Sequence, residues 1–113
     1  MFKISTNRVH DRVRIVEGAS HLDLMVDADP RSIMIKLKAA QDALQAVSQA
    51  TDDHAPGVQQ AAKAYAAAIF GPIQAEKMLD FYAGSGSAVI SLCTKYLSTR
   101  LMKLVKAAQR KLN

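Results

Sequence analysis

The stretch "HLDLMVDADPRSIMIKLKAAQDAL", residues 21–44, decides the fold because the spacing of its apolar residues changes in the middle. Up to Val26 apolar and polar residues alternate, and a period of two places the apolar set on one face of a β-strand. Asp29 is a suitable N-cap and Pro30 a suitable first residue for a helix. Beyond Pro30 the spacing becomes three or four, which predicts one apolar helix stripe made of Ile33, Leu37, Ala40, Leu44 and Val47.

Upstream of this stretch, residues 1–27 predict a β segment. Phe2 and Ile4 alternate with polar residues, and Val13 and Ile15 do the same. The turn-forming "EGAS", residues 17–20, separates the second run from the third and predicts a hairpin, extended to a meander if the first run is also a strand. Two or three short strands need a helix to cover their apolar face, so one domain of residues 1–113 is expected.

Downstream, residues 30–112 predict a helical body. A second helix is expected over residues 56–70, a break at Gly71-Pro72, a short third helix over about 73–82 and a long fourth helix from near Ser87 almost to the end. The fourth helix has an apolar stripe of Ile90, Cys93, Leu97, Leu101, Leu104 and Ala108, broadened by Val89 and Val105. The fold class is therefore α+β and mostly α, with a hairpin or meander followed by about four helices, the last one long.

The glycine-serine run "AGSGS", residues 83–87, raises the question of a phosphate-binding loop. A Walker loop needs a lysine beside its last glycine, but Ser87 follows Gly86 and the next lysine is Lys95. A dinucleotide loop needs a third glycine where Val89 stands, and a strand rather than a helix before it. Gly84 in a left-handed conformation and a serine N-cap instead predict a corner between two helices.

Other residue types offer no catalytic, cofactor-binding or metal-binding set. Cys93 lies on the apolar stripe of the fourth helix, where a thiol is usually buried. The three histidines, His10, His21 and His54, are far apart and have no ligand at helical spacing. Asp52 and Asp53 are expected to cap the second helix. The sequence predicts a protein that is not an enzyme and needs no cofactor.

The net charge of +5 is unevenly placed. No acid follows Asp80, whereas six basic residues do: Lys95, Arg100, Lys103, Lys106, Arg110 and Lys111. Such a segment either improves solubility and complements a helix dipole or provides an anionic-partner surface. Its charges are scattered and no aromatic residues interleave with them for base stacking. A nucleic-acid-binding or regulatory protein is therefore the alternative interpretation, with weak and non-specific binding at most.

Cellular location is constrained by the apolar runs. None approaches the roughly 20 residues of a membrane span, and the first fifteen residues lack the continuous apolar stretch of a signal peptide. A single cysteine cannot form an internal disulfide. The chain is expected to be cytoplasmic, with no membrane association.

The third and fourth helices carry more apolar residues than one stripe on each helix can bury. A surplus of this kind is often shared with a partner or with a second copy of the chain. Some of these residues must pack inside the monomer. The candidate partner-binding residues are Met78, Leu79, Phe81, Tyr82, Val89 and Tyr96.

The order of these segments resembles the small tail assembly chaperones encoded in the tail modules of long-tailed phages and prophages. The resemblance lies in a strand pair before a helical body, in "IFGPIQAEKMLDFY" (residues 69–82) and in "VISLCTKYLSTRL" (residues 89–101). It extends best over residues 31–104. It implies a non-enzymatic protein of the bacterial host cytoplasm that binds the helical tape-measure protein and helps to recruit tail-tube subunits. The family has no catalytic motif from which a residue-level site would follow.

Overall fold

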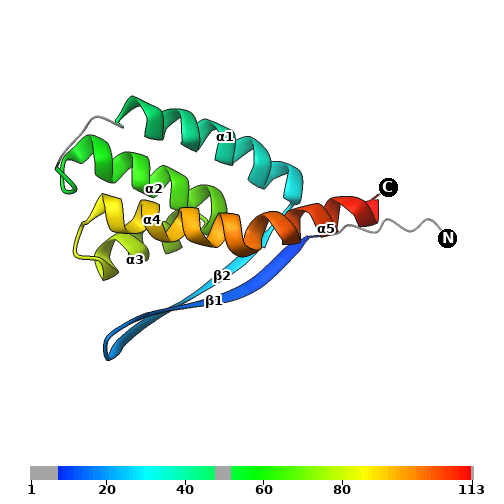
Figure 1. The fold of residues 1–113 in the computed structure, drawn as a ribbon, viewed down its shortest axis with the longest axis horizontal. Coiled ribbons are helices and arrows are strands. Elements are labelled where there is room, and N and C mark those ends of the chain that lie inside the picture. Colours follow the sequence, from blue (N-terminus) through cyan, green and yellow to red (C-terminus); the bar gives the residue numbers. More distant parts are fainter. Residues whose placement is uncertain (1–7, 48–51, 113) are drawn as a thin grey trace.

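The computed structural model describes residues 8–47 and 52–112. A two-stranded antiparallel hairpin is followed by a helical body, which confirms the α+β, mostly α class (Figure 1). The elements in chain order are β1 (Val9–Glu17), β2 (Ser20–Ala28), α1 (Pro30–Ala46), α2 (Pro56–Phe70), α3 (Pro72–Phe81), α4 (Gly86–Tyr96), the π-helical η1 (Leu97–Leu101) and α5 (Met102–Leu112). The last three form one long continuous helix.

The hairpin turns at Gly18-Ala19, within the predicted "EGAS" segment. Gly18 has a φ of +61°, which glycine adopts without the steric cost that a Cβ would impose. The register pairs Glu17 with Ser20 at the turn and Val9 with Ala28 at the open end. The strand expected at Phe2 and Ile4 lies outside the described residues.

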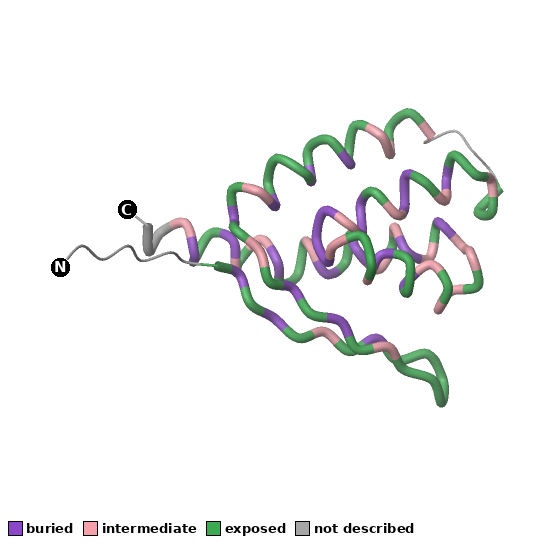
Figure 2. The backbone as a smooth tube through the Cα atoms, turned by 180° about the vertical axis from the view of Figure 1, so that it is seen from behind, coloured by how far each residue is buried: buried purple, intermediate pink, exposed green. Residues whose placement is uncertain are grey.

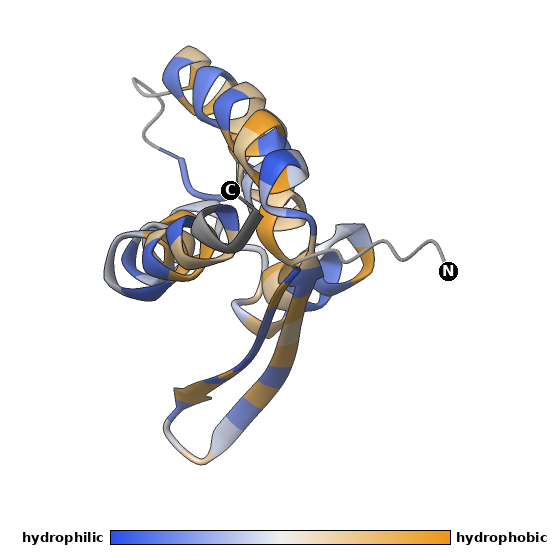
Figure 3. Cartoon of the chain, turned by 90° about the vertical axis from the view of Figure 1, so that its right-hand side faces the viewer, coloured by the Kyte–Doolittle hydropathy of each residue, from blue (hydrophilic) through white to orange (hydrophobic). Residues whose placement is uncertain are grey.

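The two faces of the hairpin differ as the alternating pattern predicts. Hydrophilic and hydrophobic residues both occur along the strands in Figure 3, and the side chains of Ile15, Leu24 and Val26 are buried against the helices. The opposite face is exposed to solvent and carries two cross-strand ion pairs, Arg8–Asp27 and Arg14–Asp23. The hairpin therefore has one face in the core and one in water.

Helix α1 begins as its capping residues predict. The Asp29 Oδ1 accepts a hydrogen bond from the Arg31 N–H at 3.1 Å, and Pro30 is the first helical residue. Ile33, Leu37 and Ala40 are buried, and α1 packs against α2. Figure 2 shows that the buried positions of α1 lie on the side that faces the rest of the helical body.

Helix α2 lies at the centre of the helical body and has the bounds that the sequence predicts. It contacts α1, α3 and α4, and its alanines Ala62 and Ala66 have no exposed surface. Small side chains at these positions let the neighbouring helices approach closely. Gly71, with a φ of +88°, and Pro72 then end α2 and start α3.

The prediction that Asp52 and Asp53 cap α2 is wrong. The N-cap is Ala55, which makes no side-chain hydrogen bond. Asp52 Oδ1 accepts from the His54 N–H at 2.9 Å within the loop, and the Asp53 carbonyl oxygen accepts from the Gly86 N–H at 2.9 Å. The two aspartates therefore stabilise the loop and join it to the start of α4.

The last helix buries a different stripe from the one that a regular α-helix predicts. Its buried side chains are Val89, Cys93 and Tyr96 in α4, then Leu101, Val105 and Ala108. The step from Tyr96 to Leu101 is five residues, because η1 inserts one extra residue into the turn. Ile90, Leu97 and Leu104, which were expected on the stripe, are only half-buried, whereas Val89 and Val105, which were expected to broaden it, are buried.

Candidate functional site

The six candidate partner-binding residues do not form one exposed surface. Met78 and Val89 have no exposed surface in the monomer, and Tyr96 is buried, with its ring stacked on Phe70 at a centroid distance of 5.6 Å. Leu79, Phe81 and Tyr82 are half-buried, and the rings of the last two meet edge to face at 5.2 Å. Half of the surplus on α3 and α4 therefore belongs to the core of the single chain.

Exposed apolar side chains lie elsewhere, at positions outside the six candidate partner-binding residues. Ile73 in the first turn of α3 and Ile35 on α1 are each 73% exposed. Ile73 directly follows the Gly71-Pro72 break. The sequence signal for this exposure is an isoleucine at the start of a short helix, at a position outside the apolar stripe of that helix.

Ile73 stands at the edge of a hollow between α2 and α3, here termed the alanine groove. The hollow has a volume of about 380 Å³ and is lined by Lys63, Ala64, Ala67, Pro72, Ile73, Ala75 and Glu76. Two of the lining residues are charged: Lys63 Nζ and Glu76 Oε1 form an exposed ion pair at 3.4 Å. The three alanines leave room for another backbone to approach, and a groove of this kind suits an apolar helix face.

A second unexpected feature is the buried carboxylate of Asp11, which joins the hairpin to the last helix. The Tyr96 hydroxyl donates to Asp11 Oδ2 at 2.7 Å, and Arg100 Nη2 donates to Asp11 Oδ1 at 2.7 Å. Arg100 Nε also donates to Oδ2. The hydrogen bond from Arg100 holds the pKa of Asp11 below its usual value, although burial opposes the shift.

The π segment brings Arg100 to this position. Tyr96 and Arg100 are four residues apart and lie on one face, while the next buried residue, Leu101, is displaced by the extra residue of η1. The sequence signal that was available is Asp11 itself, an acid between Val9 and Val13 on the inward-facing positions of β1. Burial raises the pKa of Tyr96, so its hydroxyl stays protonated and able to donate.

The "AGSGS" run forms the helix corner that the sequence predicts. The Gly84 N–H donates to the Leu79 carbonyl oxygen at 2.8 Å, and the Ala83 N–H donates to that of Asp80 at 3.0 Å, the paired pattern of a Schellman motif. Gly84 has a φ of +84°, and Ala83 before it is also left-handed at +54°. Ser85 is the N-cap of α4, and its Oγ accepts from the Ala88 N–H at 3.3 Å.

Because the corner groups are already bonded within the chain, added nucleotide is expected to leave the melting temperature unchanged. The Gly86 N–H, which a phosphate would need, donates instead to Asp53, and the Ser85 hydroxyl binds its own helix. Thermal unfolding with and without millimolar ATP and magnesium checks this, since a ligand that binds the folded state raises the melting temperature. A reproducible increase that grows with ATP concentration would contradict the structural interpretation of the loop.

The remaining chemistry-bearing groups are dispersed. Cys93 is buried, and burial raises the pKa of its thiol to about 12, which keeps it protonated and unreactive. Within residues 8–47 and 52–112, no three His, Cys, Asp or Glu side chains come together as a metal site. None of the helices in the described part of the chain combines the length and the hydropathy needed to cross a bilayer.

The basic residues of the last helix are exposed, but one of them is already engaged. Arg100 binds Asp11, whereas Lys95, Lys103 and Lys106 face solvent.

Comparison of the chain with models of known protein families, with curated protein sequences and with solved structures gives no significant match.

Proposed function

We propose that this chain is a non-enzymatic binding protein that receives an apolar helix of a protein partner in the alanine groove. The observation that carries the proposal is Ile73, a branched apolar side chain left 73% exposed beside a hollow floored by alanines. An exposed apolar residue at the edge of a groove is a typical anchor point for a partner. The surface involved lies on α2 and α3.

The partner class that we propose is the one implied by the resemblance of residues 31–104 to tail assembly chaperones. The tape-measure protein of a long-tailed phage is helical, so an amphipathic segment of it has the chemistry that the alanine groove requires. The Lys63–Glu76 ion pair at the border offers both charges to polar residues flanking such a segment. Tail-tube subunits are the second partner that the resemblance suggests.

The substitution Ile73→Lys is expected to weaken binding to a helical tape-measure segment from the same genome by at least about tenfold, the scale of an interface anchor. The lysine places a charge where an apolar contact is proposed and leaves the core untouched. Isothermal titration calorimetry against overlapping tape-measure peptides measures the effect. The matched control is Ile35→Lys on α1, because Ile35 is also 73% exposed but does not line the groove.

Three results would contradict the proposal. One is the absence of binding to any tape-measure or tail-tube segment. Another is equal weakening by both lysine variants, which would show that the groove is not the contact surface. The third is nanomolar affinity for one DNA sequence at 150 mM salt (roughly physiological), which would favour nucleic-acid binding through the basic last helix.

A further inference from the structure

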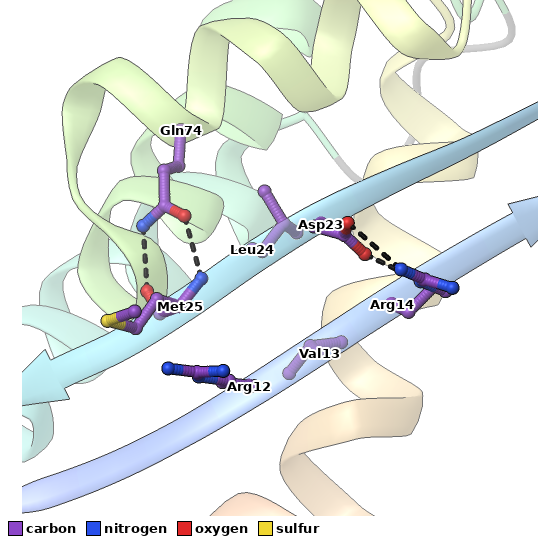
Figure 4. A pocket seen from close by; sticks show the side chains of 7 residues that line it. All are labelled: Arg12, Val13, Arg14, Asp23, Leu24, Met25 and Gln74. Atoms are coloured by element: carbon purple, nitrogen blue, oxygen red, sulfur yellow. Dashed lines mark hydrogen bonds and ion pairs between the residues drawn. The ribbon is translucent and has the colours of Figure 1, made fainter.

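The outer edge of β2 is closed by a side chain. Gln74 of α3 accepts from the Met25 N–H at 2.7 Å through its Oε1, and its Nε2 donates to the Met25 carbonyl oxygen at 2.7 Å (Figure 4). The same Nε2 lies 2.6 Å from the Phe70 carbonyl oxygen. The amide therefore occupies the place that a third strand would take on this side of the sheet.

Within residues 8–47 and 52–112, no strand or side chain pairs with the outer edge of β1. Because the backbone groups of Met25 point away from β1, those of its cross-strand partner Arg12 point away from β2. Because the backbone groups of successive strand residues point to opposite sides, those of His10, Arg14 and Val16 also point away from β2. Among the described residues, none of these four outward positions makes a backbone–backbone bond to another element, and only the Arg12 N–H lies near a carboxylate, that of Asp11. An unpaired edge of this length is a template for strand addition.

The open edge carries an unneutralised positive charge. Arg8 and Arg14 are paired with Asp27 and Asp23, but Arg12 makes no ion pair within the described part of the chain. Its side chain borders a hollow of about 540 Å³ that also reaches Arg14, Met25 and Gln74 (Figure 4). A further hollow of about 390 Å³, lined by His10, Asp11, Arg12 and Met25, also borders Arg12.

We propose that the free edge of β1 binds an extended acidic segment of a protein partner by strand addition, with an Asp or Glu of that segment opposite Arg12. Backbone hydrogen bonds would supply affinity, and the carboxylate beside Arg12 would supply specificity. A second copy of the chain fits poorly, because antiparallel pairing of two β1 edges places Arg12 of one copy beside Arg12 or Arg14 of the other. The edge lies on the hairpin and is independent of the alanine groove.

The probe is a capped peptide of alternating threonine and glutamate, nine residues long to match β1. Its counterpart has lysine in place of glutamate. Binding is measured by fluorescence anisotropy, and strand pairing by amide hydrogen exchange at His10, Arg14 and Val16. The variant is Arg12→Glu, which is expected to melt like the wild type because Arg12 makes no described ion pair.

The wild type is expected to bind the glutamate peptide at least about tenfold more tightly than the lysine peptide, and Arg12→Glu to reverse that preference. Bound peptide is expected to slow exchange at the three outward amides. Absence of binding, an unchanged preference in the variant, or binding without slower exchange would each overturn the proposal. Concentration-dependent protection of the same amides without peptide would overturn it in favour of self-pairing.

Discussion

The substitution Asp11→Ala is expected to lower the melting temperature by about 10 °C. Removal of the carboxylate leaves the buried Tyr96 hydroxyl without its acceptor and frees Arg100 from its paired hydrogen bonds. An unsatisfied buried polar group costs about 1–3 kcal/mol, and the lost connection between β1 and the last helix adds to that cost. A total of about 2–3 kcal/mol corresponds to about 10 °C in a domain of this size.

The matched control for this variant is Asp23→Ala on the opposite face of the hairpin. Asp23 also accepts two hydrogen bonds from an arginine, Arg14, but both side chains are more than half exposed. Exposed ion pairs contribute little, so only a small change in melting temperature is expected. Similar melting temperatures for wild type and Asp11→Ala would show that the buried contact does not hold the hairpin to the helix.

The Asp11 carboxylate also predicts that the stability of the fold depends on pH in the acid range. Because the folded-state pKa of Asp11 lies below the value of 3.8 in the unfolded chain, its ionised form favours folding above that pH. This contribution is lost as the pH falls through the lowered folded-state pKa. Denaturant unfolding as a function of pH is therefore expected to show that acidification lowers the free energy of unfolding less in Asp11→Ala than in the wild type.

The substitution Gly86→Ala is expected to lower the melting temperature by about 8 °C. A Cβ at this position would lie 2.7 Å from Val58 Cγ1, 3.1 Å from the Val58 carbonyl oxygen and 3.2 Å from that of Asp53. The valine side chain can rotate, but the two backbone oxygens cannot move without displacing α2 or its preceding loop. Overpacking of this kind costs about 1–3 kcal/mol, or roughly 8 °C at the centre of that range.

Gly57→Ala is the matched control for the corner. Gly57 also lies in the first turn of a helix, α2, and its added Cβ would meet only Val47 Cγ1 at an ordinary 3.7 Å. A neutral or slightly raised melting temperature is expected, because alanine reduces the conformational freedom of the unfolded chain. Thermal unfolding followed by circular dichroism measures both variants. A Gly86→Ala protein as stable as Gly57→Ala would contradict the close approach of α4 to α2.

Several features of the fold follow from residues that are neighbours in sequence. The change of period after Val26, the Asp29 cap and the Gly71-Pro72 break are each settled by interactions within one or two turns, so the pattern alone predicted β2, α1 and α2. The corner at residues 83–87 was predictable for the same reason. The capping role expected for Asp52 and Asp53 failed because α2 begins at Pro56, which places its N-cap at Ala55, and the Asp52 carboxylate accepts from the His54 N–H instead.

The pattern of the last helix could not be predicted from periodicity. A stripe drawn with regular spacing places Ile90, Leu97 and Leu104 inwards, but all three are only half-buried. The extra residue of η1 sets Tyr96 and Leu101 five residues apart on the buried face, where Leu101 was expected and Tyr96 was not. A π turn is rare and occurs as a single turn within an α-helix, so periodicity alone does not predict its position.

The amino-acid sequence by itself determined the order and type of the elements, the hairpin turn and the helix corners, because period, caps and turns depend on adjacent residues. Only the tertiary structure decided that Asp11 meets Tyr96 and Arg100, 85 and 89 residues away, that Gln74 closes the edge of β2, and that Ile73 rather than Met78 stays exposed. These contacts depend on which faces of distant elements meet. That outcome is set by the packing of the whole core, and no local pattern encodes it.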